Sequence, residues 1–534
     1  MSIISLSFVL FLVLTFCMYY LLPKRYQWVV LLAASIVFYL CAGVKSIVYI
    51  LTTATTIYAA TILMHRMAVA RKQYLKENKN SLTKEEKTQY KNTVKKKRQL
   101  VMLCALLLNL GFLFVFKYFH FALEQLNSVI AAFGGAQIED TFRLIVPLGI
   151  SFYTFQAVGY LLDVYWENVE PEQNYLKVLL FVSFFPQVTQ GPISDFQTLS
   201  GELFSGHAFS YRNYAWGFQR MVWGFFKKML IANVLSPYVS NVFDHYTSYS
   251  GISTLIGAFM YSVQIYADFS GYMDIMCGYC EMLGIRLTEN FDHPYFSKSI
   301  AEYWRRWHMS LGTWFKKYIY FPIGMSTWSR KLAKVCKQKF GKHFGDTFPA
   351  TIALLVVWLA TGVWHGASWA YIVWGLVNGL FIISSMWTEP LYAAVRKKLR
   401  INEKAPWWNV FLVIRTFILV TFIKVLPEVG TLSEGLGLWL NIFTNWTIPG
   451  GFGELLPFVD LSLTVYKINF LFAIFGTILM LAVSYIQLTN PVRVYFNRLP
   501  AFVRYIFLAV VLVLLASFGV QASWGTGGFL YAQF

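Results

Sequence analysis

Long apolar stretches separated by short polar segments follow one another along the whole chain. Four are clear, at residues 2–22, 26–44, 46–64 and 100–117. A helix needs roughly 20 apolar residues to cross about 30 Å of hydrocarbon, so these stretches are long enough to span a bilayer. Further candidates are 142–161, 213–233, 251–267, 350–364, 368–387, 408–427, 467–488 and 502–522.

These stretches are continuously apolar, whereas the strands of an outer-membrane barrel alternate apolar and polar residues. The pattern therefore predicts an all-α, polytopic membrane protein with about 11–13 transmembrane or re-entrant helices. The first stretch is too long for a signal-peptide core and lacks a small-residue cleavage site before Pro23, so we interpret it as a retained span. Because no repeat or linker divides the chain, residues 1–534 are expected to form a single membrane domain.

The composition supports a membrane protein, and the positions of the basic residues explain the high net charge. The chain is 57% hydrophobic and 13% charged, whereas charged residues make up about a quarter of a soluble protein. The net charge is +19, but the basic residues lie in loops between apolar stretches. Orientation in the membrane and contact with anionic lipid explain this distribution better than nucleic-acid binding does.

Segment 65–99 is the strongest cytoplasmic marker in the chain. Three apolar stretches precede it, so the N-terminus is expected to be extracytoplasmic, and counting onward places the C-terminus on the same side of the cell membrane. Thr83 and Glu86 have the spacing of a capping box, which predicts a basic helical loop that continues directly into the span at residue 100. The basic residues of the segment are Arg66, Arg71, Lys72, Lys76, Lys79, Lys84, Lys87, Lys91, Lys95, Lys96, Lys97 and Arg98.

Region 290–324 combines low hydropathy with many aromatic residues, which is typical of an interfacial or re-entrant segment. Ser299 and Glu302 have capping-box spacing, so a helix is expected to begin there and to end at Gly312. Glu302 is expected to form an ion pair one turn further on, with Arg305 or Arg306. Helical spacing places four residues on one face of this helix, namely Trp304, Arg305, His308 and Leu311.

His365 is the strongest candidate for chemistry, because an ionisable group at membrane depth is costly to bury. It follows an apolar run, in a predicted turn framed by Gly362 and Gly366, with Trp364 and Trp369 as possible pocket walls. A neutral imidazole there can accept a hydroxyl proton near neutral pH. The alternative is a histidine that is hydrogen-bonded for packing alone.

Two aspartates also interrupt apolar sequence. Ser270 and Gly271 are expected to break or kink the helix between Asp268 and Asp274. Asp268 then either orients a histidine or binds a polar substrate, or it satisfies the broken helix end. Nearby, Cys277 and Cys280 have zinc-like or redox spacing but lack a second pair, so packing is the favoured interpretation and no metal is predicted. Motifs of soluble nucleotide or zinc enzymes do not stand out.

At these residues the chain closely resembles the membrane-bound O-acyltransferase (MBOAT) family, in its bacterial branch of alginate and peptidoglycan O-acetylation proteins and the teichoic-acid D-alanylation protein. The resemblance covers most of the chain and rests on five motifs in order. They are Pro147 to Gln156, Phe184 to Gln187 with Gly191-Pro192-Ile193, Asp268 to Tyr272, Tyr303 to Leu311, and Trp364-His365-Gly366.

The resemblance implies helices around a central tunnel, with His365 as the catalytic histidine and His308 as the second motif histidine. It also implies transfer of acetyl from cytoplasmic acetyl-CoA, as a substrate and not a bound cofactor, to an envelope or secreted polysaccharide. An extracytoplasmic partner similar to Ser/His/Asp hydrolases would often complete the transfer. Residues expected to bind substrate or support the histidines are Asp268, Ser270, Trp304, Arg305, Trp364, Gln187 and Tyr153.

Two alternatives remain open from the sequence. One is D-alanyl transfer to teichoic acid, which would take its acyl group from a carrier protein. The other is a transporter that moves polysaccharide or lipid intermediates without chemistry, although transporters often show paired halves with matching broken helices and this chain shows no such symmetry.

Overall fold

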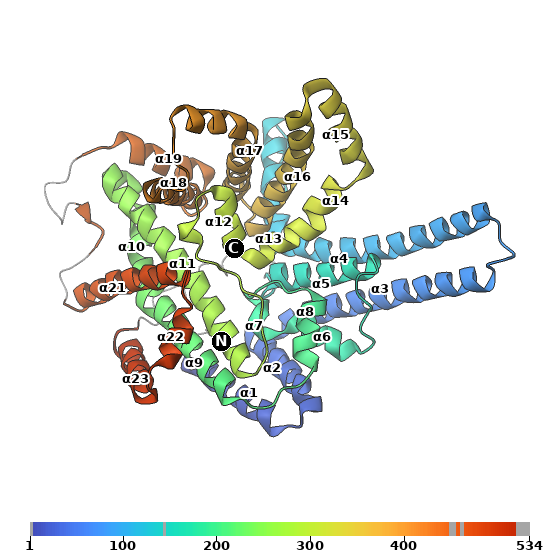
Figure 1. Cartoon of the computed structure of the whole chain (residues 1–534), viewed down its shortest axis with the longest axis horizontal. Coiled ribbons are helices and arrows are strands. Elements are labelled where there is room, and N and C mark those ends of the chain that lie inside the picture. Colours follow the sequence, from blue (N-terminus) through green and yellow to red (C-terminus); the bar gives the residue numbers. More distant parts are fainter. Residues whose placement is uncertain (1–3, 143–145, 448–454, 460–463, 520–534) are drawn as a thin grey trace. The chain divides into compact units, whose positions relative to one another are not determined.

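The computed structural model describes residues 4–142, 146–447, 455–459 and 464–519. Within these ranges the chain is helical, and its β-structure is a single isolated bridge between Phe291 and Trp307. Eight helices of the described chain are long and apolar enough to cross a membrane. These observations confirm the predicted all-α, multi-pass class (Figure 1).

The described residues form two compact units. The described residues of unit 1 lie within 1–214 and 280–288, and those of unit 2 lie within 215–279 and 289–534. The prediction of a single membrane domain stays a prediction. The helices of unit 1 are α1 (Leu6–Leu21), α2 (Gln27–Ala42), α3 (Val44–Glu77), α4 (Lys84–Ala132), α5 (Ile150–Tyr165), α6 (Tyr175–Ser183), α7 (Phe185–Val188) and α8 (Phe196–Phe204).

Helices α3 and α4 form a long antiparallel hairpin, which Figure 1 shows in blue. The capping box is present: the Thr83 hydroxyl accepts from the Glu86 amide at 3.2 Å, and the Glu86 carboxylate accepts from the Thr83 amide at 2.7 Å. Helix α4 has 49 residues, which corresponds to about 74 Å against about 30 Å of hydrocarbon. The predicted continuation of the basic helix into the membrane span is therefore confirmed.

Glu167 ties this hairpin to the end of α5. Its carboxylate lies 2.5 Å from the Arg98 guanidinium, 3.0 Å from that of Arg71 and 3.6 Å from the Lys72 ammonium. Arg98 is buried and also donates to the carbonyl of Tyr165. A buried guanidinium requires such partners, because an unpaired charge is costly away from water.

The helices of unit 2 carry the candidate site. Helix α9 (Tyr211–Phe226) begins in unit 1 and continues as a π-helical turn (Lys227–Ala232), and α11 ends in unit 1. The others in order are α10 (Asn233–Asp244), α11 (Gly251–Met282), α12 (Ile300–Arg306), α13 (Met309–Phe315), a second π-helical turn (Lys316–Tyr320), α14 (Phe321–Gly324), α15 (Thr327–Phe340), α16 (Lys342–His365), α17 (Trp369–Lys398), α18 (Pro406–Val425), α19 (Leu432–Thr444), α21 (Thr464–Gln487), α22 (Val492–Arg498) and α23 (Ala501–Phe518).

Helix α11 runs without interruption through Ser270 and Gly271, so the predicted break there is wrong. The glycines serve close helix packing instead. A Cβ atom on Gly224 would lie 2.6 Å from the Gly271 carbonyl oxygen, and one on Gly278 would lie 2.6 Å from that of Gly217. Small residues let two helix backbones approach closely. Gly271 therefore serves the packing of α9 against α11 and does not interrupt α11.

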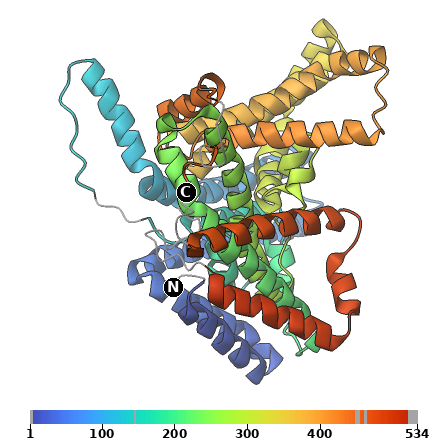
Figure 2. The ribbon, with the colours of Figure 1, turned by 90° about the vertical axis from the view of Figure 1, so that its left-hand side faces the viewer.

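Helices α16 and α17 form a second antiparallel hairpin, which lies among the yellow to orange helices at the upper right of Figure 2. A Cβ atom on Gly362 would lie 2.6 Å from the Tyr371 carbonyl oxygen, and one on Gly375 would lie 2.5 Å from that of Trp358. Gly362 and Gly375 therefore allow the backbones of α16 and α17 to approach closely. Ser368 caps α17 by accepting from the Tyr371 amide at 3.4 Å.

Gly224→Ala is expected to destabilise the protein by about 1–3 kcal/mol, because its methyl group would push α9 and α11 apart. Gly111→Ala is the matched control, since a Cβ atom there meets nothing within 4 Å and alanine is the better helix former. Thermal unfolding of the purified proteins in one detergent measures the difference. Equal melting temperatures for the two variants would contradict this account of the helix crossing.

Candidate functional site

His308 lies at a break between two short helices. Helix α12 ends at Arg306 and α13 begins at Met309, so the predicted continuous helix from Ser299 to Gly312 is wrong. His308 has φ 48°, in the left-handed region, which places it outside the helical spacing assumed for the shared face of Trp304, Arg305, His308 and Leu311. The predicted start at Ser299 is correct, because its hydroxyl accepts from the Glu302 amide at 3.1 Å.

A segment distant in sequence supplies the hydrogen bonds that this break needs. The Asn290 carbonyl accepts from the Met309 amide at 3.0 Å, and the Asn290 side-chain oxygen accepts from the Ser310 amide at 2.9 Å. The same oxygen lies 3.2 Å from His308 Nδ1. Because an amide oxygen only accepts, the neutral His308 ring carries its hydrogen on Nδ1 and Nε2 is its basic nitrogen.

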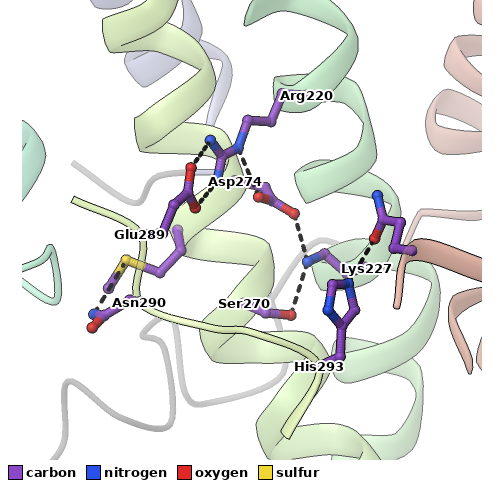
Figure 3. Close-up of polar contacts among 9 residues, drawn as sticks. Arg220, Lys227, Ser270, Asp274, Glu289, Asn290 and His293 are labelled. Carbon is purple, nitrogen blue, oxygen red and sulfur yellow. Dashed lines mark hydrogen bonds and ion pairs between the residues drawn. The ribbon is translucent and has the colours of Figure 1, made fainter. Parts of the chain in front are cut away.

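A network of charged residues holds Glu289, which precedes Asn290 in the chain (Figure 3). Arg220 donates to both carboxylate oxygens of Glu289, at 2.7 and 2.6 Å, and its Nε donates to Asp274 at 2.8 Å. Lys227 donates to Asp274 at 2.7 Å and to the Ser270 hydroxyl at 2.8 Å. Bidentate arginine pairs fix geometry as well as charge, so this network anchors the segment that positions His308.

His365 is the last residue of α16 and is 5% exposed. The predicted turn between two apolar helices is present, because Gly366 is extended and α17 begins three residues later. The Trp364 ring centroid lies 5.0 Å from that of His365 and 6.0 Å from that of His308. One tryptophan therefore contacts both candidate histidines.

The aromatic walls differ in part from the prediction. Trp369 is 51% exposed and forms no wall of this site, whereas Trp374 lies 4.8 Å from His365, measured between ring centroids. Trp304 lies 5.5 Å from Trp374 and donates through its indole to Asn378 at 2.9 Å. Trp304 therefore supports the wall around His365.

The two arginines of α12 point to different surroundings. Arg305 is exposed, so the predicted placement of its side chain beside His308 is wrong. Arg306 forms the expected ion pair with Glu302 at 2.8 Å. The break after Arg306 removes the helical register that would have carried Arg305 to the histidine.

A cavity of about 30 Å³ lies beside His365. A water molecule needs roughly 10–15 Å³ measured in this way, so the space holds about two waters and is far too small for a whole acyl thioester. The predicted tunnel stays a prediction. The lining residues are Tyr261, Ile265, Trp304, Trp307, His365, Tyr371, Trp374, Lys424, Pro427 and Glu428.

Sequence analysis missed Lys424 and Glu428. Both occur at the end of an apolar stretch. An ionisable side chain at membrane depth is costly to bury, and this marks lysine and glutamate as candidates just as it marks histidine and aspartate. Asn290 and Trp374 had no comparable signal, because their roles arise from contacts between segments that are remote in sequence.

The aspartate and serine candidates have charged partners. Asp268 forms a buried ion pair with Lys228, and Ser270 accepts from Lys227. Helix α11 is unbroken, so Asp268 does not satisfy a broken helix end. Its predicted action on a histidine or substrate stays a prediction, while the pair with Lys228 provides the compensation that a buried carboxylate needs.

Tyr153 and Gln187 belong to unit 1, and their site roles stay predictions. Tyr153 is buried on α5. The Gln187 side chain donates to the Ser194 hydroxyl at 2.7 Å and accepts from Gln156 at 3.4 Å. Cys277 and Cys280 are buried thiols on α11.

Comparison with known proteins gives consistent matches. Residues 172–338 match the profile of the MBOAT, membrane-bound O-acyltransferase, family. The chain is 31% identical to a probable alginate O-acetylase AlgI of Azotobacter vinelandii over 441 residues, 82% of this chain and 77% of the relative. It is 32% identical to the peptidoglycan O-acetyltransferase of Helicobacter pylori, over 53% and 54% of the two chains. It is 27% identical to the teichoic acid D-alanyltransferase of Bacillus subtilis, over 52% and 68%.

The His308 pKa gives a testable pH dependence. Burial lowers this pKa to about 3, whereas the unfolded chain titrates near 6.5. Below about pH 6.5 only the unfolded state binds this proton, so stability falls by about 1.4 kcal/mol per pH unit until the folded pKa is reached. From pH 6.5 to 5, wild type is expected to lose about 2 kcal/mol more than His308→Gln.

Denaturant unfolding of the purified protein in micelles at the two pH values measures this difference. His343→Gln is the matched control, because His343 is exposed, and it should keep the wild-type dependence. Parallel losses in wild type and His308→Gln would show that His308 titrates normally in the folded protein.

Proposed function

The chain belongs to the membrane-bound O-acyltransferase family and is an O-acyltransferase, and we propose that it transfers acetyl groups to a cell-envelope or secreted polysaccharide of alginate or peptidoglycan type. The observation that carries this proposal is a buried imidazole, His365, beside a small cavity at the turn between two apolar helices. The names of the alginate and peptidoglycan relatives support the acetyl group and the class of acceptor.

The proposed donor is acetyl-CoA from the cytoplasm. In the transfer, one ring nitrogen of His365 accepts the proton of an acceptor hydroxyl while the hydroxyl oxygen attacks the thioester carbonyl carbon. The carbon–sulfur bond then breaks, and the leaving thiolate takes the proton back from the imidazolium. The products are an O-acetyl ester and a free thiol, so the reaction needs no covalent enzyme intermediate.

His308 is proposed to assist without accepting the proton itself. Burial lowers its pKa to about 3, and a base so weak is poorly matched to proton transfer near neutral pH. Its fixed contact with Trp364, which also touches His365, suits it for positioning the thioester or acceptor. Trp304, Trp374 and Trp364 would exclude water around the reacting groups.

D-alanyl transfer to teichoic acid is the second candidate function, and the match to the Bacillus subtilis enzyme is the observation in its favour. It would need an acyl-carrier protein as donor. Membership of an enzyme family argues against the alternative of a transporter without chemistry. A hydrolase-like extracytoplasmic protein that receives the acetyl group is the partner we propose for the acetylation route.

The chain is a multi-pass membrane protein. We place it in the cell membrane with its N-terminus extracytoplasmic, because the most basic segment follows three apolar stretches. The same count makes the C-terminus extracytoplasmic, although residues 520–534 lie outside the described residues.

His365→Ala is expected to lower acetyl transfer by about 100-fold or more, because general-base assistance contributes roughly 10²–10⁴ in rate. The assay follows labelled acetyl from acetyl-CoA to polysaccharide in membranes that contain equal amounts of each variant. His343→Ala on the same helix should retain the wild-type rate, since His343 is exposed. Full activity of a normally inserted His365→Ala protein would end the assignment.

Cysteine labelling should report the proposed orientation. In a background without native cysteines, Ser81→Cys between α3 and α4 should react with a membrane-impermeant maleimide only after the cytoplasmic face is opened. Ser5→Cys near the N-terminus should react in intact cells. Labelling of Ser81→Cys in intact cells would invert the topology.

A further inference from the structure

Lys424 places a buried amine in the lining of the cavity beside His365. It lies in the last turn of α18 and is 6% exposed. Its ammonium donates to the Tyr295 hydroxyl at 2.9 Å and lies 3.7 Å from the centre of the Trp307 ring. The Tyr295 hydroxyl in turn donates to the carbonyl of Ser262.

These contacts hold the Lys424 amine in a fixed place. An ammonium group over an aromatic face is stabilised by the ring quadrupole, more strongly when water is excluded. Lysine has three N–H donors, and among the described residues its one hydrogen bond is to Tyr295. Lys424 lines the same cavity as His365, so its remaining donors are available to an acceptor atom that enters there.

The size of the cavity limits what can enter. Its volume of about 30 Å³ corresponds to two water-sized spheres, or roughly two to three non-hydrogen atoms. An acetyl group has three such atoms, so its size is comparable to that of this space. The cavity therefore matches the acyl end of an acetyl thioester in size.

We propose that Lys424 is a second catalytic residue of this enzyme and stabilises the negative charge that develops on the thioester carbonyl oxygen. This assignment rests on the proposed acetyl transfer. As the acceptor oxygen bonds to the carbonyl carbon, the carbonyl π electrons move to oxygen, and the Lys424 ammonium faces that charge. When the carbonyl re-forms, the electrons expel the thiolate, which takes the proton from His365, while Lys424 keeps its own proton throughout.

Glu428 offers a structural explanation that must be tested against this one. Its carboxyl lines the same cavity and interacts electrostatically with Lys424. If Lys424 served only to balance Glu428, removing both charges would relieve the defect caused by removing one. If Lys424 acts on the substrate, the double variant remains slow.

The central experiment compares Lys424→Met with wild type in steady-state acetyl transfer. Methionine keeps an unbranched side chain of similar size and removes the amine, so kcat should fall by about 100-fold or more while KM for the thioester changes little. Lys397→Met is the matched control at an exposed lysine and should behave as wild type. Lys424→Arg, which keeps a cation able to stack on Trp307, should recover at least a tenth of the wild-type kcat.

Three outcomes would overturn the assignment. They are a Lys424→Met enzyme with kcat near wild type, a folded Lys424→Arg enzyme as slow as Lys424→Met, and recovery of activity in Lys424→Met/Glu428→Gln. If Lys424→Met does not fold, Tyr295→Phe decides, because it removes the hydroxyl that holds the ammonium but leaves the cavity lining intact. Its kcat should fall several-fold, and a wild-type kcat would reject the proposal.

His365→Ala, assayed in parallel, separates the two hypotheses. An active His365→Ala enzyme rejects the proposed function and this inference together. An inactive His365→Ala enzyme with a fully active Lys424→Met enzyme rejects only the role of Lys424.

Discussion

The constraint on which the site depends is that backbone polar groups buried away from water must find partners. The chain leaves helical geometry at His308, and this would orphan amide groups if no other segment reached them. Asn290 meets that need through its carbonyl and its side chain. The left-handed backbone that displays His308 is therefore tolerated only because a second segment determines it.

The segment that carries Asn290 is held in turn by the packing of α9 against α11. Glycines at both contact points bring the two backbones close, which places Arg220 and Lys227 of the α9 region against Asp274 of α11. Each of these charges would be expensive to bury alone. Paired, they fix Glu289 and so the start of the segment that carries Asn290.

The cavity beside His365 is lined by aromatic side chains and by the ionisable residues Lys424 and Glu428. Tryptophan rings give the site an apolar lining, in which an electrostatic interaction is stronger than it would be in solution. The His365 imidazole and a lysine held on an aromatic face line the same small space. This combination suits a reaction in which a hydroxyl proton is removed while negative charge develops on a carbonyl oxygen.

The sequence alone determined what depends on neighbours along the chain: the apolar helices, the capping box at Thr83, the cap at Ser299 and the glycine-framed turn that holds His365. Hydrophobic length and local hydrogen bonds decide those features. Tertiary structure decided the break at His308, because Asn290 accepts hydrogen bonds from backbone amides after the break. Local residue spacing had instead favoured one helix that continues to Gly312. Tertiary structure also placed Lys424 and His365 in the lining of one cavity. A buried polar side chain needs partners from residues that are distant in sequence, and the periodicity of a single segment cannot predict which residues these are.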